Sequence, residues 1–192
     1  MKPLFLALII LAAPLVSMAD SWEKTEHNWN IKYKDFGLNV RNQFGSNYDH
    51  VEASYKLGSL TAAIRFAEKG GANEYRPKLT HKVFKWKVFD IGHRIEYRHH
   101  DGSKDSNWRY RLIGKASVPV TEKFSAFFKI QPRWEFGKGK DDDLSFDDIK
   151  NQFGVKYKHN KNLSFSPHVM YVLDDDFNKK SIMFGTALTV KF

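Results

Sequence analysis

The sequence predicts an all-β protein: a transmembrane antiparallel up-and-down β-barrel of about ten strands, with twelve as the alternative. Polar and apolar residues alternate with period two over segments of about ten residues, which is enough for a tilted strand to cross a membrane. The apolar faces carry mostly large aromatic and aliphatic side chains. Short and longer connections alternate along the chain, as they do between the two rims of such a barrel.

The N-terminal region is expected to be a secretory signal peptide of residues 1–19. A basic start at Met1-Lys2 is followed by an apolar run, and Ser17-Met18-Ala19 forms a small-x-small cleavage site. The barrel would then occupy residues 20–192. Export of a protein without cysteine fits the envelope of a Gram-negative bacterium, and it argues against nucleic acid as the partner of a chain with net charge +9.

The expected strands follow one another to the last residue. In 122–136, for example, Phe124, Phe128 and Trp134 share one face, while Lys129 and Arg133 share the other. The strands are expected at 37–44, 48–57, 59–67, 75–85, 89–100, 107–117, 122–136, 147–158, 162–173 and 180–192. Residues 29–34 also alternate and are a further candidate. With an even number of strands, both ends of the mature chain would lie on the periplasmic side.

Aromatic residues near the strand ends favour a membrane barrel over a soluble β-sandwich, which also alternates. A soluble fold would need the apolar faces inside and the arginine-rich faces outside. The residues expected to form interfacial girdles are Tyr75, Tyr97, Trp108, Trp134, Tyr157 and Tyr171. The outside is expected to contact outer-membrane lipid and lipopolysaccharide. The terminal Phe192 resembles the signal by which barrel assembly machinery recognises its substrates, and the barrel is expected to be a monomer.

The basic residues fall largely on the faces opposite the apolar ones, which would line the lumen. The candidate pore-lining and substrate-binding residues are Arg41, Arg65, Arg76, Lys78, Arg94, Arg98, Arg109, Arg111, Lys115, Lys129, Arg133, Lys150 and Lys156, with Lys82 and Lys191 on the same faces. The acidic residues expected there are Glu52, Glu96, Glu135 and Asp148. The expected lumen is therefore strongly basic, while the loops contain acidic runs at 141–143 and 174–176.

Rings of arginine and lysine inside a pore select anions, and the arginine fork suits planar carboxylates. Arg94 and Arg98 lie about 13 Å apart along one strand face, and Arg109 and Arg111 about 7 Å apart. We expect the constriction to be lined by these four residues with Lys129 and Arg133. The alternative is that the basic residues pair with the few inward acids and fill a narrow barrel.

The stretch 75–102, which includes Arg94-Ile95-Glu96-Tyr97-Arg98, resembles the oligogalacturonate-specific porin family, the KdgM-like small monomeric outer-membrane porins. Residues 108–111, the hairpin at 149–173 and the closing strand at 185–192 carry the same pattern of arginine and aromatic alternation. The resemblance implies a twelve-stranded barrel whose arginine-lined pore admits acidic sugars. The expected function is passive, anion-selective uptake of acidic oligosaccharides, oligogalacturonate or other uronates such as alginate fragments.

Two other functions stay open: a barrel enzyme acting on lipid or peptide, and a closed structural or adhesive barrel. His99, Asp101 and Ser103 are the residue types of a hydrolytic triad, but triads are defined by geometry and not by adjacency in sequence. The histidines offer no convergent metal ligands. We therefore expect no enzyme activity, no cofactor and no metal.

Overall fold

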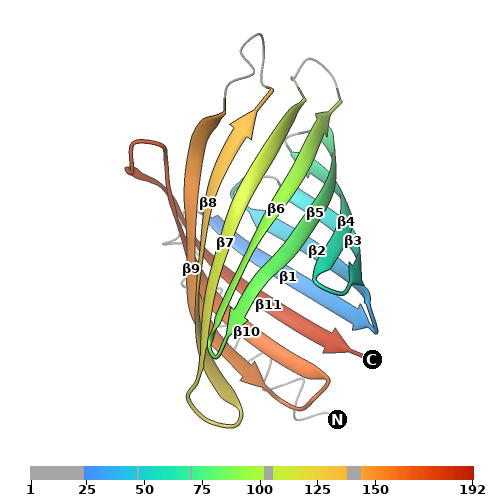
Figure 1. Cartoon of the computed structure of the whole chain (residues 1–192), viewed down its shortest axis with the longest axis vertical. Coiled ribbons are helices and arrows are strands. Elements are labelled where there is room, and N and C mark those ends of the chain that lie inside the picture. The colour runs from blue at the N-terminus through green and yellow to red at the C-terminus, as the bar shows by residue number, and fades with distance from the viewer. Residues whose placement is uncertain (1–23, 47, 70, 102–105, 138–143) are drawn as a thin grey trace.

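The computed structural model describes residues 24–46, 48–69, 71–101, 106–137 and 144–192, in which eleven strands close into one barrel (Figure 1). The strands are β1 (Lys24–Tyr33), β2 (Phe36–Phe44), β3 (Tyr48–Leu57), β4 (Leu60–Lys69), β5 (Ala72–Trp86), β6 (Phe89–His100), β7 (Asn107–Pro119), β8 (Phe124–Phe136), β9 (Ser145–Lys158), β10 (Leu163–Leu173) and β11 (Lys179–Lys191). The expected signal peptide lies outside the described residues.

The predicted fold class is confirmed, and the strand number falls between the ten and twelve considered. The additional strand is β1, which contains all but the last residue of the alternating candidate segment at 29–34. The other ten strands match the expected ranges to within a few residues. No helix in the described ranges is long and apolar enough to cross a membrane.

Strands β1 and β11 close the barrel as a parallel pair, whereas all other neighbouring strands are antiparallel. Side chains add to this seam: His27 Nδ1 lies 2.8 Å from Thr186 Oγ1, and Asn30 Nδ2 donates to the carbonyl of Leu188 at 3.3 Å. Because each hairpin reverses direction, an odd number of strands leaves the first and last pointing the same way. For the described part of the chain, the expectation that both ends share one side is therefore wrong.

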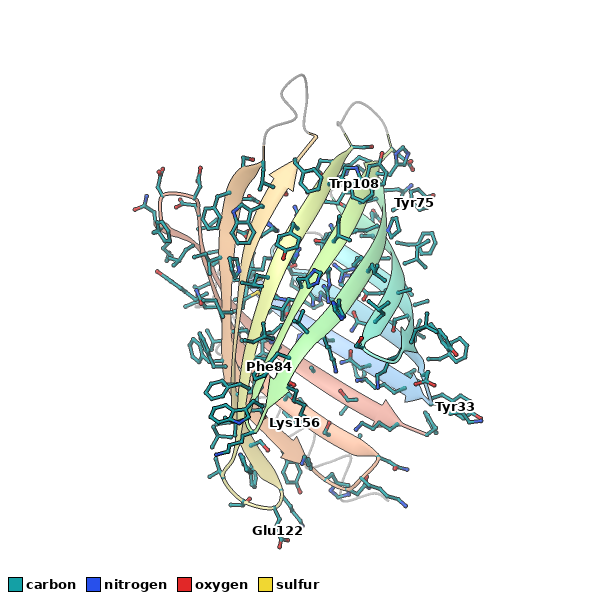
Figure 2. The ribbon with its side chains drawn as sticks, viewed as in Figure 1. Tyr33, Tyr75, Phe84, Trp108, Glu122 and Lys156 are labelled. Atoms are coloured by element: carbon teal, nitrogen blue, oxygen red, sulfur yellow. The ribbon has the colours of Figure 1, made fainter. Side chains whose placement is uncertain are left out.

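The two rims of the barrel differ. One rim, the short-turn end, carries the tight connections after β1, β3, β5, β7 and β9. The opposite rim, the long-loop end, carries the three longest connections, which follow β6, β8 and β10. Glu122 marks the short-turn end in Figure 2, and Tyr75 and Trp108 mark the long-loop end.

The outer surface of the barrel is apolar. Phe36, Phe84 and Trp29 expose 61%, 52% and 52% of their area, and Figure 2 shows Phe84 and Tyr33 pointing away from the ribbon. Soluble monomers rarely expose contiguous apolar surfaces of this extent. The outward direction predicted for the apolar faces is confirmed, and this surface is suited to the hydrocarbon of a membrane.

Aromatic side chains gather at both rims, as the sequence predicts. The ring pairs at the long-loop end are Tyr97 with Trp108 at 5.0 Å and Phe66 with Tyr75 at 5.3 Å. The ring pairs at the short-turn end are Phe36 with Tyr55 at 4.7 Å and Phe124 with Tyr157 at 5.0 Å. Two such girdles delimit the hydrocarbon zone of a transmembrane barrel.

Gly154 allows β9 and β10 to approach closely. A Cβ at this position would lie 2.3 Å from the carbonyl oxygen of Pro167 and 2.9 Å from the Cα of His168. We expect Gly154→Ala to lower the free energy of unfolding by about 2 kcal/mol, because the two backbones must separate. The measurement is denaturant unfolding in detergent micelles.

Gly114→Ala is the matched control, since its Cβ would meet only Ile130 Cγ2, at 3.0 Å. That methyl group can move with its side chain, so we expect a loss of about 0.5 kcal/mol or less. Equal losses for the two variants would contradict this account of the β9–β10 contact.

Candidate functional site

The interior of the barrel is polar and charged. The hydrophobic residues buried among the described ones are Ala67, Met170, Val172 and Met183, whereas the buried polar and charged residues are far more numerous. Every arginine of the sequence lies on an inward face. Arginine is thus confined to the interior, while lysine also occupies the rims and turns.

All the candidate pore-lining residues lie on inward faces. The buried ones are Arg76, Lys78, Arg109, Arg111 and Arg133. The half-buried ones are Arg41, Arg65, Arg94, Arg98, Lys129, Lys150 and Lys156, and Lys115 is exposed near the short-turn end. Their role in lining a pore and in binding substrate remains a prediction.

Arginines on neighbouring strands face one another across the ladder. Arg94 on β6 pairs in register with Arg111 on β7, which pairs with Arg133 on β8. The next row contains Glu96, Arg109 and Glu135, so acids and a base alternate beside the arginines. Arg94, Arg111 and Arg133 thus form a row around the wall of the barrel. The sequence alone shows only how arginines are spaced along one strand.

A network of ion pairs, which we name the ion-pair belt, connects these rows. Glu96 accepts from Arg111 at 2.8 Å and lies 3.6 Å from Arg109, and Arg109 also binds Glu135. Arg98 contacts Glu74 at 2.9 Å and Glu135 at 3.3 Å. The connected members of the belt are Glu74, Arg76, Glu96, Arg98, Arg109, Arg111, Arg133, Glu135, Asp147 and Asp148. We include in the belt the adjacent group of Glu52, Arg65 and Lys78, whose ion pairs are with one another.

The belt is tightly packed. Glu96 is 1% exposed and Asp148 is 2% exposed, although both point into the lumen. Arg133 binds both Asp147 and Asp148, and Arg76 binds Glu74. At this level the charged side chains bury one another almost completely inside the barrel.

The interior holds three acids that the sequence analysis did not place there: Glu26, Glu74 and Asp147. Glu26 lies in β1, which the ten-strand prediction leaves out, and it binds His168 at 3.0 Å. Glu74 directly precedes the expected strand 75–85, and extending the alternation by one residue would have found it. Asp147 sits at a break in the β8–β9 register, which strand parity cannot anticipate.

Some inward bases have no acidic partner. Arg94 donates to Thr80 Oγ1 at 2.8 Å, and none of the ion pairs among the described residues involves Arg94, Lys129 or Lys150. Lys129 pairs in register with Lys115, so two ammonium-bearing chains lie side by side. Uncompensated positive charge therefore begins where the ion-pair belt ends and continues toward the short-turn end.

The wall opposite the belt carries a neutral patch. Met170, Val172 and Met183 form a buried cluster on β10 and β11, and Gln43 Nε2 donates to Met183 Sδ at 2.9 Å. The belt and its unpaired neighbours lie mainly on β3 to β9. Most of the charged side chains thus lie on one side of the bore, while the other side combines this neutral patch with the ion pairs of Glu26 to Arg41 and His168.

Among the described residues, His99 and its neighbours at the long-loop end do not form a buried catalytic triad. His99 Nδ1 lies 3.1 Å from Ser106 Oγ and its Nε2 lies 4.0 Å from Asp101, with His99 and Asp101 about half exposed. A triad acid is buried and holds the imidazole in place. Ser103 and residues 141–143 lie outside the described residues. Within them, no group of three histidine or acidic side chains is arranged to hold a metal ion.

A closed barrel with an apolar outer surface and a charged interior has the fold of a small outer-membrane porin. The chain belongs to the family described as "Protein of unknown function (DUF2490)", whose model matches residues 39–183. It is similar to a solved structure titled "KdgM porin", at 19% identity and a TM-score of 0.50 over 87% of this chain and 86% of that one.

The chain is also similar to an "Anion-selective porin from Comamonas acidovorans", at 14% identity and a TM-score of 0.34 over 81% of this chain. It covers 52% of that porin, about half of its length. No curated protein matched.

Proposed function

We propose that the protein is an outer-membrane porin for the passive, anion-selective uptake of acidic oligosaccharides. The substrates would be oligogalacturonate or other uronates, such as alginate fragments. One observation carries this proposal: every arginine lies inside the barrel, and Arg94, Arg111 and Arg133 form a continuous row across three strands. Arginine forks bind carboxylates with two parallel hydrogen bonds, and this row repeats that group along a path.

The ion-pair belt suggests how such a solute would pass. Carboxylates of the protein already occupy the guanidinium groups, as Glu96 does with Arg111 and Asp148 with Arg133. A uronate carboxylate would replace one protein carboxylate at a time, so that no arginine loses its counter-charge during the exchange. Binding at each step stays weak, which conduction requires.

Arg94 and Lys129 would bind an incoming carboxylate first. Neither has an ion pair among the described residues, and both lie beside the belt. The neutral patch at Met170, Val172 and Met183 would face the sugar rings while the charged wall holds their carboxylates.

The protein would reside in the outer membrane of a Gram-negative bacterium, as a monomer in contact with lipid and lipopolysaccharide. Phe192, which is 76% exposed, would be the residue recognised by barrel assembly machinery.

The near-complete burial of Glu96 and Asp148 favours a second candidate, a closed barrel with a structural or adhesive role. In that case the ion pairs would be permanent and the loops would carry the function. Reconstitution into planar bilayers separates the two: a closed barrel gives no conductance, and a porin gives anion-selective conductance.

We expect Arg109→Gln with Arg111→Gln to lower the anion preference of the channel, because Glu96 would lose its two nearest counter-charges and Glu135 one of its two. The measurement is the reversal potential in a salt gradient. The matched control is Lys34→Gln with Lys87→Gln, which removes the same charge from the turns. These lysines lie over the rings of Tyr33 and Trp86, at 5.5 and 4.9 Å. Equal changes in both pairs, or a cation preference in the unmodified protein, would contradict the proposal.

The substrate class is tested by liposome swelling with a galacturonate trimer and with maltotriose, a neutral sugar of the same length. Faster entry of the galacturonate trimer supports uronate uptake, and equal rates would contradict it.

A further inference from the structure

Inward-facing lysines lie near the short-turn end on every odd-numbered strand. These strands all run toward that rim, and each places at least one lysine close to its end on the inner face. We name this set the lysine ring: Lys32 on β1, Lys56 on β3, Lys82 on β5, Lys115 on β7, Lys156 on β9 and Lys191 on β11. Figure 2 labels Lys156 in the lower half of the barrel.

The lysines of the ring point into one lumen. Lys32 and Lys191 are paired in register at the parallel seam. Lys115 is paired in register with Lys129 of β8, a further inward-facing base. The six strands are distributed around a closed barrel, so their inward-facing charges surround a common space.

This charge is not balanced by acids. Among the described residues, no ion pair includes a lysine of the ring. The inward acid of the described strands at this rim is Asp90, which is paired in register with Lys85 on one side and Lys115 on the other. Asp35 and Glu122 lie exposed in the turns. In the ion-pair belt, by contrast, carboxylates neutralise most of the arginines.

A ring of like charges around a narrow opening concentrates the electrostatic potential there and raises the local concentration of anions. Lysine ammonium groups are compact point charges on flexible stems, so they attract negative charge without imposing the planar geometry of a guanidinium. The ring is therefore suited to the charge of a solute rather than to its shape.

We propose that the lysine ring is a second anion-binding site, separate from the ion-pair belt, for solutes that carry several carboxylate or phosphate groups. The inference rests on the proposed function in one respect: it assigns the ring to the same acidic solute as that solute enters or leaves at the short-turn end. Binding itself needs no conduction and can be measured on the full chain in detergent.

The test is titration calorimetry at low ionic strength with inorganic tripolyphosphate, a galacturonate trimer and maltotriose. We expect the two anions to bind and maltotriose not to bind. Lys32→Gln with Lys156→Gln should weaken binding of tripolyphosphate by about tenfold, because each lost charge acts on a multivalent anion at short range. Lys34→Gln with Lys87→Gln removes the same charge outside the lumen and should change binding by less than about twofold.

Equal weakening by the two lysine pairs would overturn the proposal, because binding would then reflect only the overall charge. So would loss of tripolyphosphate binding in the Arg109→Gln, Arg111→Gln variant with no loss in the ring variant, because the site would then be the belt. Binding of tripolyphosphate without binding of the galacturonate trimer would overturn the assignment of the ring to the acidic sugar.

The ring and the channel can fail separately. If anion binding depends on the ring but the protein shows no conductance, the proposed porin function is wrong and the anion-binding site at the ring is supported. Selective conductance with unchanged anion binding in the ring variant would disprove the ring and leave the channel.

Discussion

Replacing Glu96 by glutamine is expected to lower the free energy of unfolding by about 3–5 kcal/mol, because a buried ion-pair network loses its central carboxylate. Glu96 is 1% exposed and lies 2.8 Å from Arg111, 3.6 Å from Arg109 and 3.9 Å from Arg76. Glutamine has almost the same shape and can still accept a hydrogen bond, so the loss reports the charge. Denaturant unfolding in lipid vesicles measures it.

The same variant has an expected effect on selectivity. Arg76, Arg109 and Arg111 would share less negative charge, so the folded fraction of Glu96→Gln should show a stronger preference for anions than the unmodified protein. Glu122→Gln is the matched control: it makes the same chemical change in an exposed turn (Figure 2) and should alter stability by less than about 0.5 kcal/mol. An unchanged stability of Glu96→Gln would contradict the account of the belt.

Ile95→Arg is expected to cost about 2–4 kcal/mol of stability, because it places a charge on the lipid-facing side at the middle of a strand. Ile95 lies halfway along β6, and its register partners Leu79 and Tyr110 also point outward. Unfolding in lipid vesicles, compared with the unmodified protein, measures the loss.

Val120→Arg provides the control, since Val120 lies in the β7–β8 turn and is 68% exposed. We expect that change to cost less than about 0.5 kcal/mol. If both variants lost equally little, the apolar outer face would not be in contact with lipid.

Much of the fold follows from strand parity in the sequence. Alternation assigns Phe124, Phe128 and Ile130 to the outside and Lys129 and Arg133 to the inside, and the structure places them there. The reason is physical: side chains of a strand alternate between its faces, and a membrane barrel gives those faces opposite solvents. Assigning residues to the outer or the inner face does not require knowledge of which strands are neighbours.

The detail of the candidate site depends on register, which parity does not contain. The row of Arg94, Arg111 and Arg133 exists because three strands align at those residues, and a shift of two residues would keep every face and abolish the row. Asp147 joins the belt through an irregularity after Arg133 in the β8–β9 pairing. Glu26 lies on β1, and the alternation in the sequence identifies only residues 29–34 of that region as a candidate strand.

The parallel seam has a consequence for the order of folding. Ten of the eleven contacts around the barrel join strands that follow one another in the chain, and each can form locally as a hairpin. The β1–β11 pairing joins residues such as His27 and Thr186, which are 159 positions apart. Contacts between such distant residues require the closure of a long loop, and they are the slowest to form. We therefore expect the barrel to form first as an open, curved sheet. The pairing of β1 with β11 would then form last and close the wall.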